Sequence, residues 1–250
     1  MDGYFGLALE SAEGSGSGIE ITKKRLSSHL TCLSFFAERG FGEGALREKG
    51  RYYTLLTEEN LVENEKLERE IGKEIATILS SLAGGGMRKV LAVGLGNPAA
   101  VVDALGAETM KRLSAGEKAD GYLATLTPSV FGMTGLETYS VVKGVAAEYH
   151  PDMILCVDTL STRRAERLYR AVQIGEGGIV PGGGVGNKRK PLSKENLGVP
   201  VISVGVPLLA HADRCSSLPE GLVVTPKEID LLVPAFARAL ARGVEEGLTK

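Results

Sequence analysis

Tryptophan is absent from the sequence, and cysteine and histidine occur three times each. The cysteines, Cys32, Cys156 and Cys215, lie far apart and form no CxxC pair. A disulfide framework or a cysteine-rich zinc site is therefore not expected, and a reducing compartment such as the cytoplasm is favoured. The histidines form no HExxH motif and no pair at helical spacing, which argues against a zinc protease. We expect neither a bound metal nor a cofactor.

Long apolar runs and a strong net charge are also lacking. No stretch of about 18 apolar residues occurs, so no membrane-spanning helix is expected. The first residues have neither the basic region nor the long apolar region of a secretory signal. The 29 basic and 31 acidic side chains leave a net charge of −2, and the pI is near 6.0, whereas nucleic-acid-binding domains usually exceed a pI of about 9. Neither a membrane nor a nucleic acid is therefore expected as a direct partner.

Glycine, in contrast, is abundant, at 33 of the 250 residues, against a usual share of about 7%. Seven glycines lie in the segment 175–186, which is followed by the basic run Lys188–Lys190. Backbone N–H groups in such a loop can form an anion-binding nest, but the loop can equally line a peptide cleft or be a solvated surface loop. Its candidate cleft residues are Gly183, Gly184, Gly186, Asn187, Lys188 and Arg189.

From about residue 60 onward, buried strands alternate with amphipathic helices. Apolar runs typical of strands cover 89–97, 121–128, 152–160, 171–175 and 200–207. Helices are expected over 60–82, 99–113, 136–149 and 162–168, and again from Thr225, with a kink or a break at Pro234. This alternation predicts a mostly parallel sheet with helices on both faces. The length fits one α/β domain, which we place at 19–250, after a flexible Gly- and Ser-rich leader at 1–18.

Two aspartates stand where such a sheet binds ligands, at the carboxyl ends of its strands. Asp158 ends the apolar run MILCVD, and Asp103 follows the GLGN turn by six residues. If the two strands are neighbours, the carboxyl groups meet in one crevice and share a proton, so that one can activate water while the other acts as an acid. Alternatively, Asp103 only complements a helix N-terminus and Asp158 only ends a strand.

Other candidate motifs are weaker. Ala99 stands where a GxGxxG dinucleotide fingerprint needs glycine, and no acid ends the following strand at the usual distance. Glu137, in the glycine turn GMTGLET, is either a functional acid or a partner for a helix dipole. Cys156 lies within an apolar strand and is expected to be part of the core.

Several longer motifs together resemble the germination proteases, or spore proteases, of endospore-forming bacteria. They follow the family's order and span roughly residues 19–250, and the block GGGVGNKRK followed by LGVPVISVGVP is highly specific. The matching runs are VLAVGLGN with VDALG, SVFGMTGLET, PDMILCVDTL, VQIGEGGIVPGGGVGNKRKPLSKENLGVPVISVGVP and LVVTPKEID.

The resemblance implies a three-layer α/β/α sandwich, similar to that of hydrogenase maturation proteases. It also implies an endopeptidase that starts the breakdown of the small acid-soluble proteins that coat DNA in the dormant spore. Such enzymes are made in the forespore as zymogens that lose a short N-terminal propeptide, and they assemble as tetramers. Two aspartates are considered catalytic in this family, and by motif they correspond to Asp103 and Asp158. Asn97 and Glu137 are further candidates for the substrate cleft.

The chain resembles a shortened member of the family, with little sequence between VGVPLLAHAD and GLVVTPKEID. AVVDALGAE stands where the family has TPDALGP, and VDTLSTRRA stands where it has IDALAARS. Gly6 precedes Leu7 where the family places an acid at its processing junction. Three alternatives remain open: a nickel-binding peptidase of the hydrogenase-maturation type, a catalytically silent sporulation protein that binds partners through its basic glycine loop, and a nucleotide-binding protein.

Overall fold

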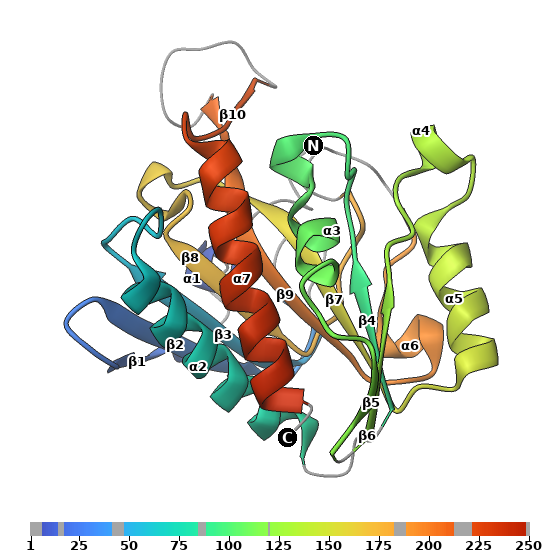
Figure 1. The fold of residues 1–250 in the computed structure, drawn as a ribbon. Coiled ribbons are helices and arrows are strands. Elements are labelled where there is room, and N and C mark those ends of the chain that lie inside the picture. Colours follow the sequence, from blue (N-terminus) through green and yellow to red (C-terminus); the bar gives the residue numbers. More distant parts are fainter. Residues whose placement is uncertain are drawn as a thin grey trace.

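The computed structural model describes residues 7–14, 18–41, 48–84, 89–119, 121–182, 189–212 and 222–248. Within these ranges ten strands form one sheet in the order β1-β2-β3-β8-β9-β7-β4-β6-β5, and β10 pairs with β9 (Figure 1). The strands are β1 (Thr22–Arg25), β2 (Leu30–Ala37), β3 (Gly50–Thr57), β4 (Lys89–Gly94), β5 (Gly116–Lys118), β6 (Gly121–Leu126), β7 (Met153–Thr162), β8 (Ala171–Gly175), β9 (Val201–His211) and β10 (Val223–Val224).

The parallel part of this sheet is confined to its centre. Strands β6, β4, β7 and β9 run parallel to one another, as the apolar runs predict. On one side β8, β3, β2 and β1 continue the sheet with antiparallel pairs, and on the other side β5 does the same. The connections from β1 to β2 and from β5 to β6 are too short for a parallel pair, which needs a long crossover. The sheet is therefore mixed, with its parallel strands where the site is expected.

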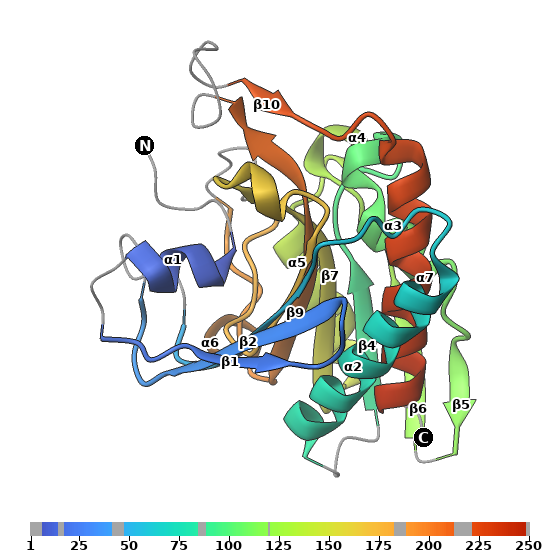
Figure 2. The same ribbon diagram turned by 90° about the vertical axis from the view of Figure 1, so that its left-hand side faces the viewer.

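Helices cover both faces of the sheet and make a three-layer α/β/α sandwich, which confirms the expected fold class (Figures 1 and 2). Helices α2, α3 and α7 lie on one face, and α1, α5 and α6 lie on the other. The helices are α1 (Ala8–Gly14), α2 (Glu65–Ala83), α3 (Leu105–Met110), α4 (Phe131–Thr134), α5 (Thr138–Tyr149), α6 (Lys194–Leu197) and α7 (Ile229–Leu248), with 3₁₀ turns η2 (Val101–Asp103) and η3 (Ala165–Arg167).

The central strands supply side chains to both cores alternately. In β4, Val90 and Ala92 join the α2–α7 side, whereas Leu91 and Val93 join the α5–α6 side. Cys156 in β7 is fully buried on the α5–α6 side, so its expected place in the core is confirmed. A strand apolar on both faces is what burial between two helical layers requires.

Three expected helices differ from the structure. The helix expected over 99–113 is split into η2 and the short α3, and the one expected over 162–168 is reduced to η3, because β7 continues to Thr162. The C-terminal segment forms one helix, α7, that continues through Pro234. Its apolar side packs along α2, and this tertiary packing outweighs the local cost of the proline.

The N-terminal segment is a further correction. The leader at 1–18 is expected to be flexible, yet Ala8–Gly14 form α1, and Leu7 and Leu9 are fully buried. Both leucines pack with Leu160 of β7 and with side chains of β2 and β3. The Gly- and Ser-rich composition that suggested a linker begins only where this helix ends.

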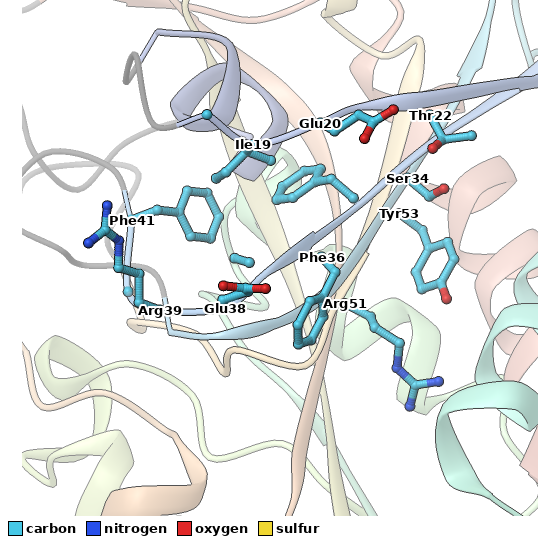
Figure 3. Close-up of a pocket in the computed structure, with 14 residues that line it drawn as sticks. Ile19, Glu20, Thr22, Ser34, Phe36, Glu38, Arg39, Phe41, Arg51 and Tyr53 are labelled. Atoms are coloured by element: carbon cyan, nitrogen blue, oxygen red, sulfur yellow. The ribbon is translucent and has the colours of Figure 1, made fainter.

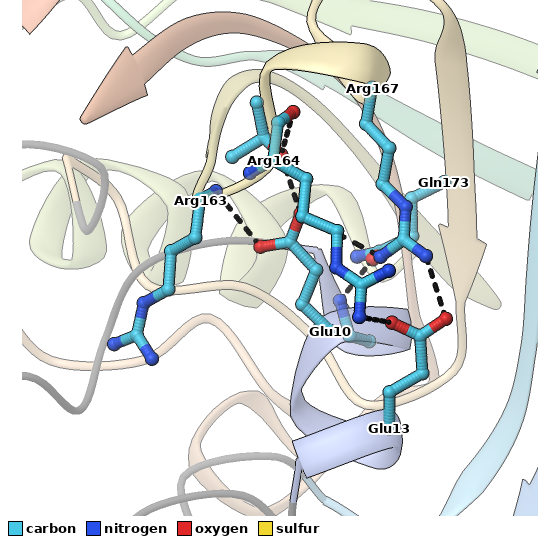
Figure 4. Close-up of polar contacts among 8 residues, drawn as sticks. Glu10, Glu13, Arg163, Arg164, Arg167 and Gln173 are labelled. Atoms are coloured by element: carbon cyan, nitrogen blue, oxygen red, sulfur yellow. Dashed lines mark hydrogen bonds and ion pairs between the residues drawn. The ribbon is translucent and has the colours of Figure 1, made fainter. Parts of the chain in front are cut away.

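Two acidic side chains of α1 join it to the chain that follows Asp158 (Figure 4). The Glu10 carboxylate accepts hydrogen bonds from the Thr162 hydroxyl and, at 3.0 Å, from the Arg163 backbone N–H. The Glu13 carboxylate pairs with Arg167 at 2.6 Å and with Arg164 at 3.0 Å. The helix is thus bound to the carboxyl end of β7 by charge-assisted hydrogen bonds, which are stronger than neutral ones.

Arg167 is the buried member of this network, because only 7% of its side chain is exposed, against 48% for Arg164. Arg167 Nη1 also lies 3.7 Å from Oε1 of the buried Glu10. We predict that Arg167→Met lowers the free energy of unfolding by about 3–5 kcal/mol, since it leaves this buried carboxylate without its cation. Arg164→Met is the matched control and is expected to cost about 1 kcal/mol or less. Urea denaturation followed by circular dichroism measures both, and equal losses would contradict the prediction.

Candidate active site

The site begins where β4 ends beside its parallel neighbour β7, which continues to Thr162, so Asp158 lies within β7 and does not end it as expected. Strands β4 and β7 are neighbours, with Gly94 opposite Val157 at the last pair of the ladder. The Leu95 N–H continues the ladder and donates to the Val157 carbonyl at 2.8 Å. Asp158 therefore lies beside the point where the chain leaves β4. The two strands are neighbours, as the hypothesis of a shared site for Asp103 and Asp158 requires.

A tight turn then brings Asp103 back to the same place. Gly96 has a φ of +95°, and a Cβ atom on it would lie 2.1 Å from the Asp103 carbonyl oxygen and 2.9 Å from Oδ1. The Asn97 backbone N–H donates to Asp103 Oδ2 at 2.7 Å. Only glycine combines this positive φ with so close an approach. The GLGN turn thus cradles a carboxylate of this chain rather than a nucleotide phosphate.

Gly106 allows the next helix to lie directly on the strands. A Cβ atom there would come within 2.4 Å of the Leu95 backbone N and O and 2.6 Å of the Val157 carbonyl oxygen. Gly94 lies opposite Gly106, and a Cβ atom on Gly94 would lie 2.4 Å from the Gly106 carbonyl oxygen. The glycine of VDALG therefore places α3, and η2 before it, against the end of β4 and the middle of β7.

Asp158 itself is almost completely buried, with 4% of its surface exposed. Its Oδ1 accepts the Thr159 backbone N–H at 2.9 Å. The Thr159 hydroxyl donates at 2.9 Å to the carbonyl of Val102, the residue before Asp103. Asp103 is less enclosed than Asp158 and stays partly open to solvent.

The two carboxyl groups titrate in unlike surroundings. Burial, and then the negative charge of Asp103, raise the pKa of Asp158 well above its usual range. Burial also raises the pKa of Asp103, but the Asn97 N–H opposes this shift because it stabilises the ionised carboxylate. Asp103 therefore ionises first, and its charge then holds the proton on Asp158. Two carboxyl groups whose pKa values are pushed apart in this way are typical of acid–base pairs.

Three of the other predicted site residues, Asn97, Glu137 and Arg189, lie in the described part of the chain. Asn97 adjoins the aspartate pair, but its side-chain Oδ1 accepts from the Ala99 N–H, so the backbone makes the contact with Asp103. Glu137 is exposed at the N-cap of α5, where its side chain makes no capping hydrogen bond. Arg189 is half-buried. The remaining loop candidates, Gly183, Gly184, Gly186, Asn187 and Lys188, lie outside the described residues.

Lys190, next to Arg189, has a definite neighbour in the helical layer. Its Nζ lies 4.2 Å from the centre of the Tyr139 ring in α5. The Tyr139 hydroxyl donates to the Asn196 carbonyl at 3.0 Å. The Lys190 ammonium, together with Lys143, lowers the pKa of Tyr139. The chain leaving the glycine loop is thereby attached to the α5–α6 face.

A hollow of about 1170 Å³ occurs elsewhere, on the antiparallel part of the sheet (Figure 3). Phe36, Arg51 and Tyr53 are among the side chains that line it, and β3 is three strand positions away from β7. This hollow is therefore separate from the aspartate pair. In the described part of the chain, no three His, Cys, Asp or Glu side chains gather as a metal site would require. None of the described helices has the length and apolar composition of a membrane span.

Sequence reasoning missed Thr159 and the packing role of Gly106. Thr159 gives no signal by itself, because a threonine near the end of a strand is common. Gly106 gives a weak signal, because a glycine in the first turn of a helix is unfavourable unless another part of the chain approaches it closely. Both become informative only when the two strand ends are placed together.

The sequence also matches a known protein family. The family model described as germination protease matches residues 38–218, which is more than half of the chain. The chain belongs to the germination protease family. Germination proteases of Bacillus cytotoxicus and Priestia megaterium are 32% and 34% identical over 94% and 89% of this chain. That of Caldanaerobacter subterraneus subsp. tengcongensis is 31% identical over 95% of it.

The share of each relative that is covered varies. The chain spans 66% of the B. cytotoxicus germination protease and 62% of the P. megaterium one, but 88% of the Caldanaerobacter one. Among solved structures, a [NiFe] hydrogenase maturation protease from Thermococcus kodakarensis aligns with a TM-score of 0.47 and 21% identity, over 69% of this chain and 99% of that one.

The raised pKa of Asp158 has a consequence for stability. The folded state binds the Asp158 proton more tightly than the unfolded state, so this stabilisation is complete below the unfolded pKa of about 3.9 and is lost as the pH rises through the folded pKa. We predict that Asp158→Asn equals the wild type in stability near pH 3 and exceeds it increasingly at higher pH.

Urea denaturation at several pH values measures this difference. Asp230→Asn, an exposed change at the beginning of α7, serves as the control and is expected to keep the wild-type pH dependence. A constant difference between Asp158→Asn and the wild type across the pH range would show that Asp158 is not the responsible group.

Proposed function

We propose that this chain is an endopeptidase that begins the degradation of small acid-soluble spore proteins during germination, in the forespore or spore core. Membership in the germination protease family supports the reaction class. The observation that carries the mechanism is the aspartate pair, with one carboxyl held by the Asn97 N–H and the other buried beside it.

In the proposed reaction, the ionised Asp103 removes a proton from a water molecule, and the water oxygen attacks the peptide carbonyl carbon. Asp158 gives its proton to the leaving nitrogen as the C–N bond breaks. Asp103 then carries a proton and Asp158 does not, so transfer of the proton from Asp103 to Asp158 restores the starting state. Asp103 suits the base role because it is the more open carboxyl and the first to ionise.

The surrounding residues have supporting roles in this proposal. Asn97 would hold the Asp103 carboxylate through its backbone N–H. The glycine loop, with Arg189 and Lys190 at its end, would line the cleft and favour acidic segments of the substrate. Assembly as a tetramer, as the family resemblance implies, belongs to the same proposal, and sedimentation of the purified chain tests it.

The first test is proteolysis of a purified small acid-soluble spore protein, followed by electrophoresis and mass spectrometry. General acid–base catalysis typically contributes about 10²–10⁴-fold, and we predict a loss of kcat/KM of this size for Asp103→Asn and for Asp158→Asn. Glu117→Gln, an exposed neutralisation in the edge strand β5, is the control and is expected to retain full activity. Wild-type cleavage that neither aspartate variant reduces would overturn the assignment.

The pH profile provides a second test. Activity requires an ionised Asp103 and a protonated Asp158, so we predict that kcat/KM rises with pH as the first carboxyl ionises and falls as the second does. Both limbs are expected above the pH at which free aspartates titrate, because burial raises both pKa values. A profile that only rises and then stays level would exclude Asp158 as the acid.

A further inference from the structure

Thr159 makes two contacts of different kinds, one to each half of the site. Its backbone N–H donates to the Asp158 carboxyl, and its side-chain hydroxyl donates to the Val102 carbonyl in η2. Val102 is 57 positions away in the chain and immediately precedes Asp103. One residue therefore connects the strand that bears one aspartate with the turn that bears the other.

The turn η2 needs such a connection. It is three residues long, and neither of its ends is capped by a side chain. The bond from the Asn97 N–H to Asp103 holds the turn to its own loop, but that loop follows β4 and not β7. Among the described residues, the Thr159 hydroxyl supplies a hydrogen bond that ties η2 directly to β7.

The glycine contacts between α3 and the strands cannot replace this hydrogen bond. Gly94 and Gly106 permit a close approach, which sets how near α3 lies to the sheet. Such van der Waals contacts depend weakly on direction, whereas a hydrogen bond fixes both distance and angle. Thr159 is 6% exposed, so water competes little for its partners.

On this evidence we infer that Thr159 is a positioning residue for the aspartate pair: its hydroxyl fixes the turn that carries Asp103 against the strand that carries Asp158. The inference deepens the proposed peptidase mechanism and rests on it for its catalytic consequence. Thr159 does not itself transfer a proton in that mechanism. It holds the two carboxyl groups at the separation at which the charge of one retains the proton of the other.

The test compares four full-length chains: the wild type, Thr159→Val, Thr159→Ser and Thr109→Val. Valine keeps the shape of threonine and removes the hydroxyl, whereas serine retains the hydroxyl. Thr109 is the matched control, because it is fully buried in α3 and its hydroxyl donates to the Leu105 carbonyl at 2.8 Å. The Thr109→Val substitution removes a buried hydrogen bond of similar length that involves neither aspartate.

The first readout needs no substrate. Titration of ¹³C-labelled aspartate carboxyls by NMR, assigned with the Asp103→Asn and Asp158→Asn variants, follows each group separately. We expect Thr159→Val to bring the pKa of Asp158 down toward its usual range, because η2 and its charge are no longer held close. Thr159→Ser is expected to restore the wild-type titration, and Thr109→Val to leave it unchanged.

The second readout is proteolysis. A misplaced catalytic group costs up to about 10²-fold, so we expect Thr159→Val to lower kcat roughly 10- to 100-fold with little change in KM, and the alkaline limb of its pH profile to move to lower pH. If the wild type cleaves no spore protein, the proposed function fails while the NMR titration still decides on Thr159. Wild-type titration in Thr159→Val, or an equal effect of Thr109→Val, would overturn the inference.

Discussion

The arrangement of the aspartate pair depends on the close approach of α3 to the end of β4 and to the middle of its parallel neighbour β7. Gly94 and Gly106 face one another there, and a Cβ atom on either would collide with backbone atoms. Without that approach the chain after β4 would stand away from β7, and Asp103 would face solvent rather than Asp158. Two of the many glycines thus have a defined structural role at this point. A few glycines are needed because backbone, and not side chain, fills the space between helix and strand.

The same packing creates the electrostatic asymmetry of the site. It encloses Asp158 within β7, a strand that is buried on both faces, while Asp103 stays partly open and receives a backbone N–H. Because burial raises the pKa of both carboxyl groups, it lowers the free energy of unfolding above the pH at which free aspartates ionise. Such a cost is typical of sites whose function needs a group in an unusual protonation state.

The parts of the molecule that could be predicted from the sequence are those with a strong periodic signal. The four parallel strands and the long helices α2 and α7 each carry a long apolar pattern, and the strand ends point to Asp103 and Asp158. Strand β2 and helix α1 were not predicted. The alternation in LTCLSFFA is weak, and the short helix at LALE is stable only because Leu7 and Leu9 enter a site made by distant strands. Thr159 could not be predicted either, since its role depends on a partner 57 positions away.

Helix α1 extends the dependence of the aspartate pair to the beginning of the described chain. Glu10 binds Thr162 and the Arg163 backbone at the carboxyl end of β7, only four positions beyond Asp158. Leu7 and Leu9 pack against Leu160, which lies between these two points on the strand. The strand that carries Asp158 is thus held on one side by η2 through Thr159 and at its end by α1. Removal of residues from Leu7 onward would therefore weaken the support of β7 itself.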